Sequence, residues 1–249
     1  MDQGGVFVIL FKMVRYHQKK YPSYSPLHLE EVAGHFDVKR VFPTLPYSLH
    51  TEYSYGKRTF QSELIQKYPE IVRATQDGIP QLWKNEVWAE SFAAFLMKLT
   101  KNMPAPSVIE IHPPFHDYVG SMREFIEIYQ VFETQIKSRW QETDILIENR
   151  CGSRYRGGRF LISTAPQIKE LCAWIESEHL KLRIAFDIPQ LYTAHQVTPK
   201  RSYEICALLE ELKEIRQYIG GVHIWGKRTS HSRRISHCGD LNTYFNNDM

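Results

Sequence analysis

The chain has 249 residues, of which 43% are hydrophobic and 24% are charged, and its net charge is +3. This composition is typical of a globular protein with a sizeable core, and the length matches one (β/α)8 barrel of about 250 residues, so we predict one domain over residues 1–249. No run approaches the ~20 apolar residues of a membrane helix, no signal-peptide pattern opens the chain, and the four cysteines form no C-x-x-C pair. These features argue against a membrane protein or a zinc knuckle and favour a cytoplasmic protein.

The first part of the chain has a weak secondary-structure pattern. Val6–Val14 is predicted to be the first strand, and Leu27–Phe36 a short helix. Tyr47–Tyr53 resembles a strand end that presents His50. The polar stretch Ser54–Asn85, with its glycines and prolines, predicts a long loop containing one helix.

The later part of the chain alternates between helical and strand patterns. Apolar residues recur at helical spacing in four segments, which are Trp88–Leu99, Ser121–Trp140, Pro166–Ser177 and Ser202–Tyr218. These helices separate short apolar runs that read as buried parallel strands. The alternation predicts repeated βα units from residue 88 to residue 224.

Four of the apolar runs end in a side chain that can bind a metal. They are Val108–His112, Ile145–Glu148, Leu182–Asp187 and Gly221–His223. Their last residues are separated by 36, 39 and 36 positions, the length of one βα unit. Since the carboxyl ends of the strands in a (β/α)8 barrel form its active site, the sequence predicts this fold, with the four side chains converging on one face.

Two groups of cations follow these strand ends, with no acidic residue inside either group. They are Arg150, Arg154, Arg156 and Arg159 after Glu148, and Lys227, Arg228, Arg233 and Arg234 after His223. Each group alone reads equally well as a solvated loop. Two groups beside one metal site favour an anionic substrate, because cations at the mouth of a site attract and hold phosphates.

The strand-end residues also have structural explanations. A buried unpaired charge is costly, so Glu148 and Asp187 could instead pair with local arginines, and His112 could cap its strand. Glu110 alternates onto the inward face with His112, and we predict that it pairs with an arginine such as Arg183 inside the barrel.

The strand ends resemble a known superfamily in their order and spacing. His50–Tyr53, His112–Pro114, Glu148–Gly152, Asp187–Gln190 and His223–Gly226 are similar to the strand ends of the xylose isomerase-like TIM barrels. This superfamily includes endonuclease IV (AP endonuclease family 2) and many sugar and sugar-phosphate isomerases and epimerases, and the similarity covers roughly residues 45–245. It implies divalent metals at the carboxyl-terminal face but does not choose the reaction.

The resemblance also implies a role for each matched residue. Glu148 would bridge two metals, completed by His50 and His112 on one side and by Asp187 and His223 on the other. Mixed nitrogen and oxygen ligands favour Zn or Mn. In isomerase relatives a single metal is held by the equivalents of Glu148, Asp187 and His223 with a final glutamate. Glu148 and Asp187 would be catalytic, and the predicted substrate-binding residues are Tyr53, Arg154, Arg156, Lys227 and Arg228.

Two departures from the endonuclease IV pattern are apparent. Gln190 stands where a ligand of a third zinc is expected, and no apolar strand with an acidic end follows His223. We therefore expect a barrel that lacks its last strand in this chain. Unpaired strand edges would favour an oligomer.

Three functions are compatible with these patterns. The first is hydrolysis of a phosphoester of an anionic substrate, DNA among the candidates, by metal-activated water. The second is isomerisation or epimerisation of a sugar or sugar phosphate at one metal, with Glu148 or a neighbour moving a proton. The third is a degenerate barrel that binds nucleic acid or protein without catalysis. Two bound metals favour the first, one favours the second, and none favours the third.

Overall fold

A parallel sheet forms the centre of the molecule. The computed structural model describes residues 14–15, 28–34, 43, 46–51, 66–73, 81–152, 159–197, 202–230 and 233–236. Within this part, seven strands lie side by side in chain order, and every neighbouring pair is parallel. The strands are β1 (Val14–Arg15), β2 (Leu29–Gly34), β3 (Tyr47–Thr51), β4 (Val108–Ile111), β5 (Asp144–Glu148), β6 (Leu182–Asp187) and β7 (Ile219–His223). This strand order is that of a (β/α)8 barrel, so the predicted fold class is confirmed as a partial barrel.

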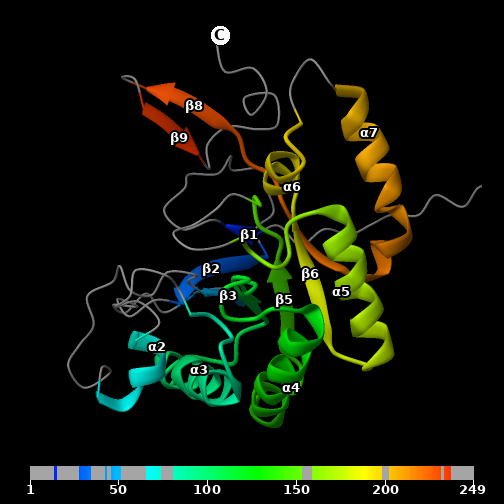
Figure 1. The fold of residues 1–249 in the computed structure, drawn as a ribbon. Coiled ribbons are helices and arrows are strands. Elements are labelled where there is room, and N and C mark those ends of the chain that lie inside the picture. The colour runs from blue at the N-terminus through cyan, green and yellow to red at the C-terminus, as the bar shows by residue number, and fades with distance from the viewer. Residues whose placement is uncertain are drawn as a thin grey trace, which may run out of the picture.

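From β3 to β7 helices separate the strands, as the apolar periodicity predicted for residues 88–224 (Figure 1). They are α2 (Pro69–Arg73), α3 (Glu86–Leu99), α4 (Met122–Arg139), α5 (Ala165–Ser177), α6 (Ile188–Ala194) and α7 (Ser202–Glu211). The predicted single helix over Ser202–Tyr218 ends at Glu211 and continues as the 3-10 helix Lys213–Tyr218. Among the described residues, no helix has the length and apolar content needed to cross a membrane.

Capping side chains fix where the long helices begin. Asn85 accepts a hydrogen bond from the backbone N–H of Trp88 at 2.8 Å, and Ser121 accepts one from Glu124 at 3.2 Å. These contacts satisfy backbone donors that have no partner inside the helix. The polar caps therefore place the first turns of α3 and α4 just before their apolar stripes.

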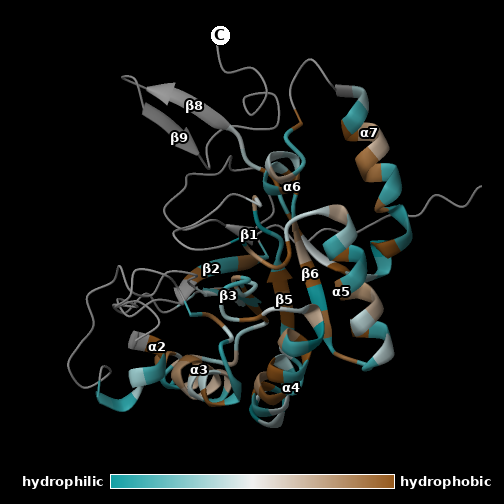
Figure 2. Ribbon diagram, in the orientation of Figure 1, coloured by the Kyte–Doolittle hydropathy of each residue, from teal (hydrophilic) through white to brown (hydrophobic). Residues whose placement is uncertain are grey.

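The main hydrophobic core lies between the sheet and α3, α4 and α5. Along β4 and β5, Ile109, Ile111, Ile145 and Ile147 are fully buried on one face. Hydrophobic residues on β5 and along α3 and α4 are visible in Figure 2. Because strand side chains alternate between faces, Glu110 and Glu148 point to the opposite face. The sheet thus separates an apolar layer from a polar one.

A cluster of aromatic rings joins the segment before α3 to helices α3 and α4. Trp83 lies at its centre, with ring centroids 5.0–6.1 Å from five neighbours, Trp88, Phe92, Phe125, Tyr129 and Phe132. Aromatic pairs at such distances add stability beyond the burial of their area. The cluster thus fixes the segment before α3 against the two helices.

The N-terminal prediction was wrong in one segment. The predicted helix over Leu27–Phe36 is strand β2, whose residues from Glu30 to Gly34 pair with β3. Leu29, Glu30 and Val32 are buried there. Pairing with two parallel neighbours outweighs a local helical pattern, because strand formation depends on tertiary packing. The predicted strand Val6–Val14 lies outside the described residues except for Val14 in β1.

The sheet does not close within the part of the chain that the structure describes. There β1 pairs with β2 alone and β7 with β6 alone. After β7, the chain forms a separate antiparallel ribbon of β8 (Lys227–Ser230) and β9 (Arg233–Ser236). Lys227 and Arg228, which were predicted in a loop, therefore lie on strand β8.

Candidate metal centre

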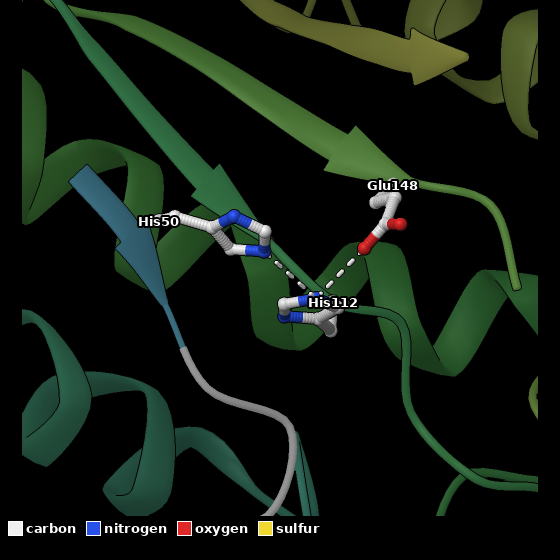
Figure 3. Close-up of side chains that lie close together, drawn as sticks. All are labelled: His50, His112 and Glu148. Atoms are coloured by element: carbon white, nitrogen blue, oxygen red, sulfur yellow. Dashed lines mark hydrogen bonds and ion pairs between the residues drawn. The ribbon is translucent and has the colours of Figure 1, made fainter. Parts of the chain in front are cut away.

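The polar face of the sheet gathers imidazole and carboxylate groups at the carboxyl ends of its strands. Figure 3 shows His50 from β3, His112 directly after β4 and Glu148 at the end of β5 pointing toward one another. The two histidine Nε2 atoms are 3.4 Å apart, and His112 Nε2 lies 2.8 Å from Glu148 Oε2. These three residues form the first ligand group.

A second group lies beside the first. His223, the last residue of β7, places Nε2 3.2 Å from Glu110 Oε2 and Nδ1 3.6 Å from Glu148 Oε1. Glu110 comes from β4, where it pairs in register with His50 of β3. Glu110, Glu148 and His223 therefore form the second ligand group.

Both groups combine imidazole and carboxylate donors at a spacing that could hold a divalent metal. Within each group the ligand atoms all lie within 4.8 Å of one another, so small movements would bring them to the ~2 Å bonds of a bound metal. Glu148 belongs to both groups, with Oε2 facing the first and Oε1 the second. Glu110 Oε1 is buried and accepts no hydrogen bond from the described residues. The donor set fits Zn or Mn.

Glu148 has two further partners besides the histidines. Arg150 Nη1 lies 2.8 Å from Oε2, and the amide of Gln190 donates to Oε1 at 3.2 Å. Burial raises the pKa of Glu148, but Arg150 and His112 outweigh it and hold the pKa well below its usual range. The carboxyl group is therefore ionised and ready to bind a cation. The ion pair between Glu148 and a local arginine, which the sequence left open, is present. Arg150 contacts Oε2, the oxygen that faces the first ligand group.

Asp187 lies next to the second group but outside it. Its Oδ1 accepts from the backbone N–H of Gln190 at 2.8 Å, and its Oδ2 accepts from Trp225 Nε1 at 2.8 Å. His223 Nδ1 is 3.8 Å from Oδ2. Burial and the charge of Glu148 raise the pKa of Asp187 to about 8. Both oxygens thus accept a hydrogen bond, and Asp187 is a member of neither ligand group.

The histidines of the site carry opposite pKa shifts. Burial lowers the pKa of His50, but the carboxylates of Glu110 and Glu31 outweigh it and raise the pKa to about 9. The pKa of His223 rises well above its usual value, since Glu110 and Glu148 outweigh the burial of its ring. Burial lowers the pKa of His112. Without a metal, protonated histidines balance part of the buried negative charge.

Two acidic residues of this site, Glu110 and Glu31, were not among the predicted metal ligands. Glu110 was predicted to face inward, but its predicted partner was wrong, since Arg183 donates to the backbone carbonyl of Ile219 at 2.7 Å and is exposed. The alternation of Glu110 with His112 was the available signal. Glu31 lies 3.4 Å from His50 Nδ1 and was missed because its strand was predicted as a helix.

Trp83 supports the first group from below. Its indole N–H donates to the backbone carbonyl of His112 at 2.7 Å. Trp83 is also one of the few non-glycine residues with a positive φ, 60°. Such a conformation is strained, and the aromatic cluster around the ring stabilises it.

The remaining predicted residues are not placed by the structure. Tyr53, Arg154 and Arg156 lie outside the described residues. Lys227 and Arg228 are described only through the backbone pairing of β8. Their predicted role in substrate binding stays a prediction.

Comparison with known proteins finds matches among solved structures. No protein-family model matches the chain, and no curated protein matches its sequence. Among solved structures, AsfvAP:AG is 14% identical with a TM-score of 0.45, covering 78% of this chain and 66% of that one. The probable 3-DHS dehydratase AsbF, involved in petrobactin synthesis in Bacillus anthracis, is 12% identical with a TM-score of 0.37.

A third similar structure is a xylose isomerase domain protein from Planctomyces limnophilus. It is 13% identical with a TM-score of 0.43, and the match covers 87% of this chain and 84% of that one. The match to AsbF covers 82% of this chain and 52% of AsbF. The chain therefore spans about two thirds of the length of AsfvAP:AG and about half of the length of AsbF.

Proposed function

We propose that this chain is a divalent-metal-dependent hydrolase that cleaves a phosphoester of an anionic substrate, with DNA among the candidates. The observation that carries the proposal is the position of Glu148, whose two oxygens face two different ligand groups. A carboxylate placed in this way can hold two cations about 3.5–4 Å apart. Such a pair of metals, when bound, would activate a water and stabilise the leaving oxygen.

The residues around the ligand groups support this chemistry. Gln190 orients Glu148 through Oε1, and Trp225 orients Asp187 through Oδ2. Asp187 lies beside the second group, with Oδ2 3.8 Å from His223 Nδ1, and a carboxylate within reach of a bound water can take its proton. We therefore assign proton transfer from the attacking water to Asp187 Oδ2.

Metal content of purified variants tests the proposal. Wild-type protein should bind two Zn or Mn ions, His50→Ala and His223→Ala should each lose one, and Glu148→Ala should lose both. His116→Ala is the matched control, because His116 is exposed in the loop after β4. Elemental analysis of the dialysed proteins gives the count. Wild-type protein free of metal after reconstitution would contradict the proposal and support the non-catalytic barrel.

Cleavage of a small phosphodiester and of DNA tests the catalytic activity. The reconstituted protein should cleave bis(p-nitrophenyl) phosphate or DNA with an abasic site, and a chelator should stop the reaction. Asp187→Asn should keep the metals and lower kcat, since an amide does not accept the proton. Equal rates for Asp187→Asn and wild type would remove the assigned role of Asp187.

A sugar or sugar-phosphate isomerase is the second candidate. The observation in its favour is that Glu110, Glu148 and His223 form a ligand group of their own, whose two carboxylates and one imidazole suit a single metal. One bound metal per chain, together with turnover of a sugar phosphate and no cleavage of phosphodiesters, would favour this function.

A further inference from the structure

Oε2 of Glu148 contacts both a candidate metal ligand and an arginine. Oε2 lies 2.8 Å from His112 Nε2 and 2.8 Å from Arg150 Nη1. The same carboxylate belongs to the ligand group of His50 and His112. A metal in that group and the guanidinium of Arg150 would repel each other across a short distance in a buried place, where electrostatic forces are strong. Metal binding and the Arg150 contact are therefore in competition.

Arg150 has other contacts that hold it at the edge of the site when its contact with Glu148 is lost. Its backbone N–H donates to the carbonyl of Ile162 at 2.9 Å, which holds the backbone of Arg150 two residues after the end of β5. Its guanidinium carbon lies 5.2 Å from the centroid of the Phe160 ring, a distance at which a cation and an aromatic face attract. The side chain is 11% exposed, so it reaches both the buried carboxylate and the solvent side.

We propose that Arg150 neutralises Glu148 in the metal-free protein and binds the phosphate group of the substrate once a metal has taken Glu148 Oε2. The inference rests on the proposed function and deepens it, because it assigns a phosphate subsite next to the first ligand group. A guanidinium suits this task, since its planar donors match two phosphate oxygens at once. The metal and Arg150 would then face the same phosphate from two sides.

Two binding measurements on one variant test the inference. Arg150→Gln removes the cation that competes with the metal, so titration of the metal-free protein with Mn²⁺ should show tighter binding than in wild type. The metal-loaded variant should bind inorganic phosphate about 10- to 100-fold more weakly, the usual loss for a charged hydrogen bond. A residue with only a structural role would weaken both, so the opposite signs are diagnostic.

Matched variants separate charge from geometry. Arg139→Gln makes the same charge change at the exposed end of α4, near the amino ends of the strands, and should leave both affinities unchanged. Arg150→Lys keeps the charge but loses the paired donors, so its phosphate affinity should fall between those of wild type and Arg150→Gln.

The possible outcomes point to different conclusions. Wild-type protein that takes up no Mn²⁺ overturns both the proposed function and this inference. Wild-type protein that binds Mn²⁺, with equal phosphate affinity in Arg150→Gln and wild type, overturns the inference alone. Weaker Mn²⁺ binding in Arg150→Gln also overturns it. If Arg150→Gln fails to fold, the phosphate affinity of Arg150→Lys decides, and a value equal to wild type overturns the inference.

Discussion

The metal-free protein should lose stability as the pH rises through the neutral range, because of His50. The pKa of this histidine is about 9 in the folded protein, against 6.5 for a free side chain. Between these values the folded state binds more protons than the unfolded state, so the free energy of unfolding falls with increasing pH. The stabilisation is complete below pH 6.5 and is lost as the pH passes the folded-state pKa of about 9.

The structure sets the size of the effect. One pKa unit corresponds to about 1.4 kcal/mol, so the shift of His50 amounts to at most about 3 kcal/mol. The carboxylates responsible lie 3.4 Å from Nδ1 in Glu31 and 3.6 Å from Nε2 in Glu110, and the side chain is 24% exposed. Asp187, whose pKa is raised from 3.8 to about 8, changes stability in the same direction. The wild-type loss should therefore exceed that of His50 alone.

Urea unfolding of chelator-treated protein at several pH values between 6.5 and 9 measures this loss. His50→Gln removes the titrating ring and should lower stability mainly at the acidic end, which flattens the pH dependence. His116→Gln should follow wild type. Saturating Zn²⁺ should reverse the trend, because metal ligands must be deprotonated and metal binding therefore strengthens with pH. A metal-free wild type whose stability is constant or rises from pH 6.5 to 9 would refute the reasoning.

Three further predictions concern the framework of the site. Trp83→Phe removes the donor to the buried carbonyl of His112 and should lower the free energy of unfolding by about 1–3 kcal/mol in urea titrations. Gly220→Ala places a Cβ in overlap with a side chain of β5 and should cost about 1–3 kcal/mol, whereas Gly120→Ala, with its nearest neighbour at 3.8 Å, should be neutral by the same measurement. Cys172 is buried with a pKa raised to about 12, so mass spectrometry should find it unmodified by iodoacetamide until the protein unfolds.

The fold was predictable where strand and helix patterns repeat along the chain. From β4 to β6, each strand is a short apolar run followed by a helix, and both patterns are local in sequence. Strand β2 shows the limit, because Leu29–Gly34 includes two adjacent glutamates and resembles a polar helix segment. Its strand conformation depends on pairing with β3. In this pairing Glu30 lies opposite Tyr47, which is 17 positions later in the sequence. Such pairing is a property of the fold and not of the segment.

The site was predictable for residues that end a strand and less so for residues inside one. His112, Glu148, Asp187 and His223 follow apolar runs, so their positions at the carboxyl edge could be read from the sequence. Glu110 lies inside its strand, where a buried carboxylate is unusual, and only its neighbours across the sheet explain it. Asp187 also accepts from Trp225 Nε1, a contact between different βα units that no local pattern encodes.

The charge balance of the site connects its stability with its proposed chemistry. Glu31, Glu110 and Glu148 cannot lie together on a largely buried face without cations, because unpaired buried charges are expensive. In the metal-free protein these cations are His50, His223 and Arg150. The two histidines carry a positive charge only when they are protonated. A bound metal would supply the same charge without the protons, which releases the imidazoles as ligands and the guanidinium for an anion. The groups that stabilise the metal-free fold are therefore the groups that metal binding would convert into ligands and a phosphate contact.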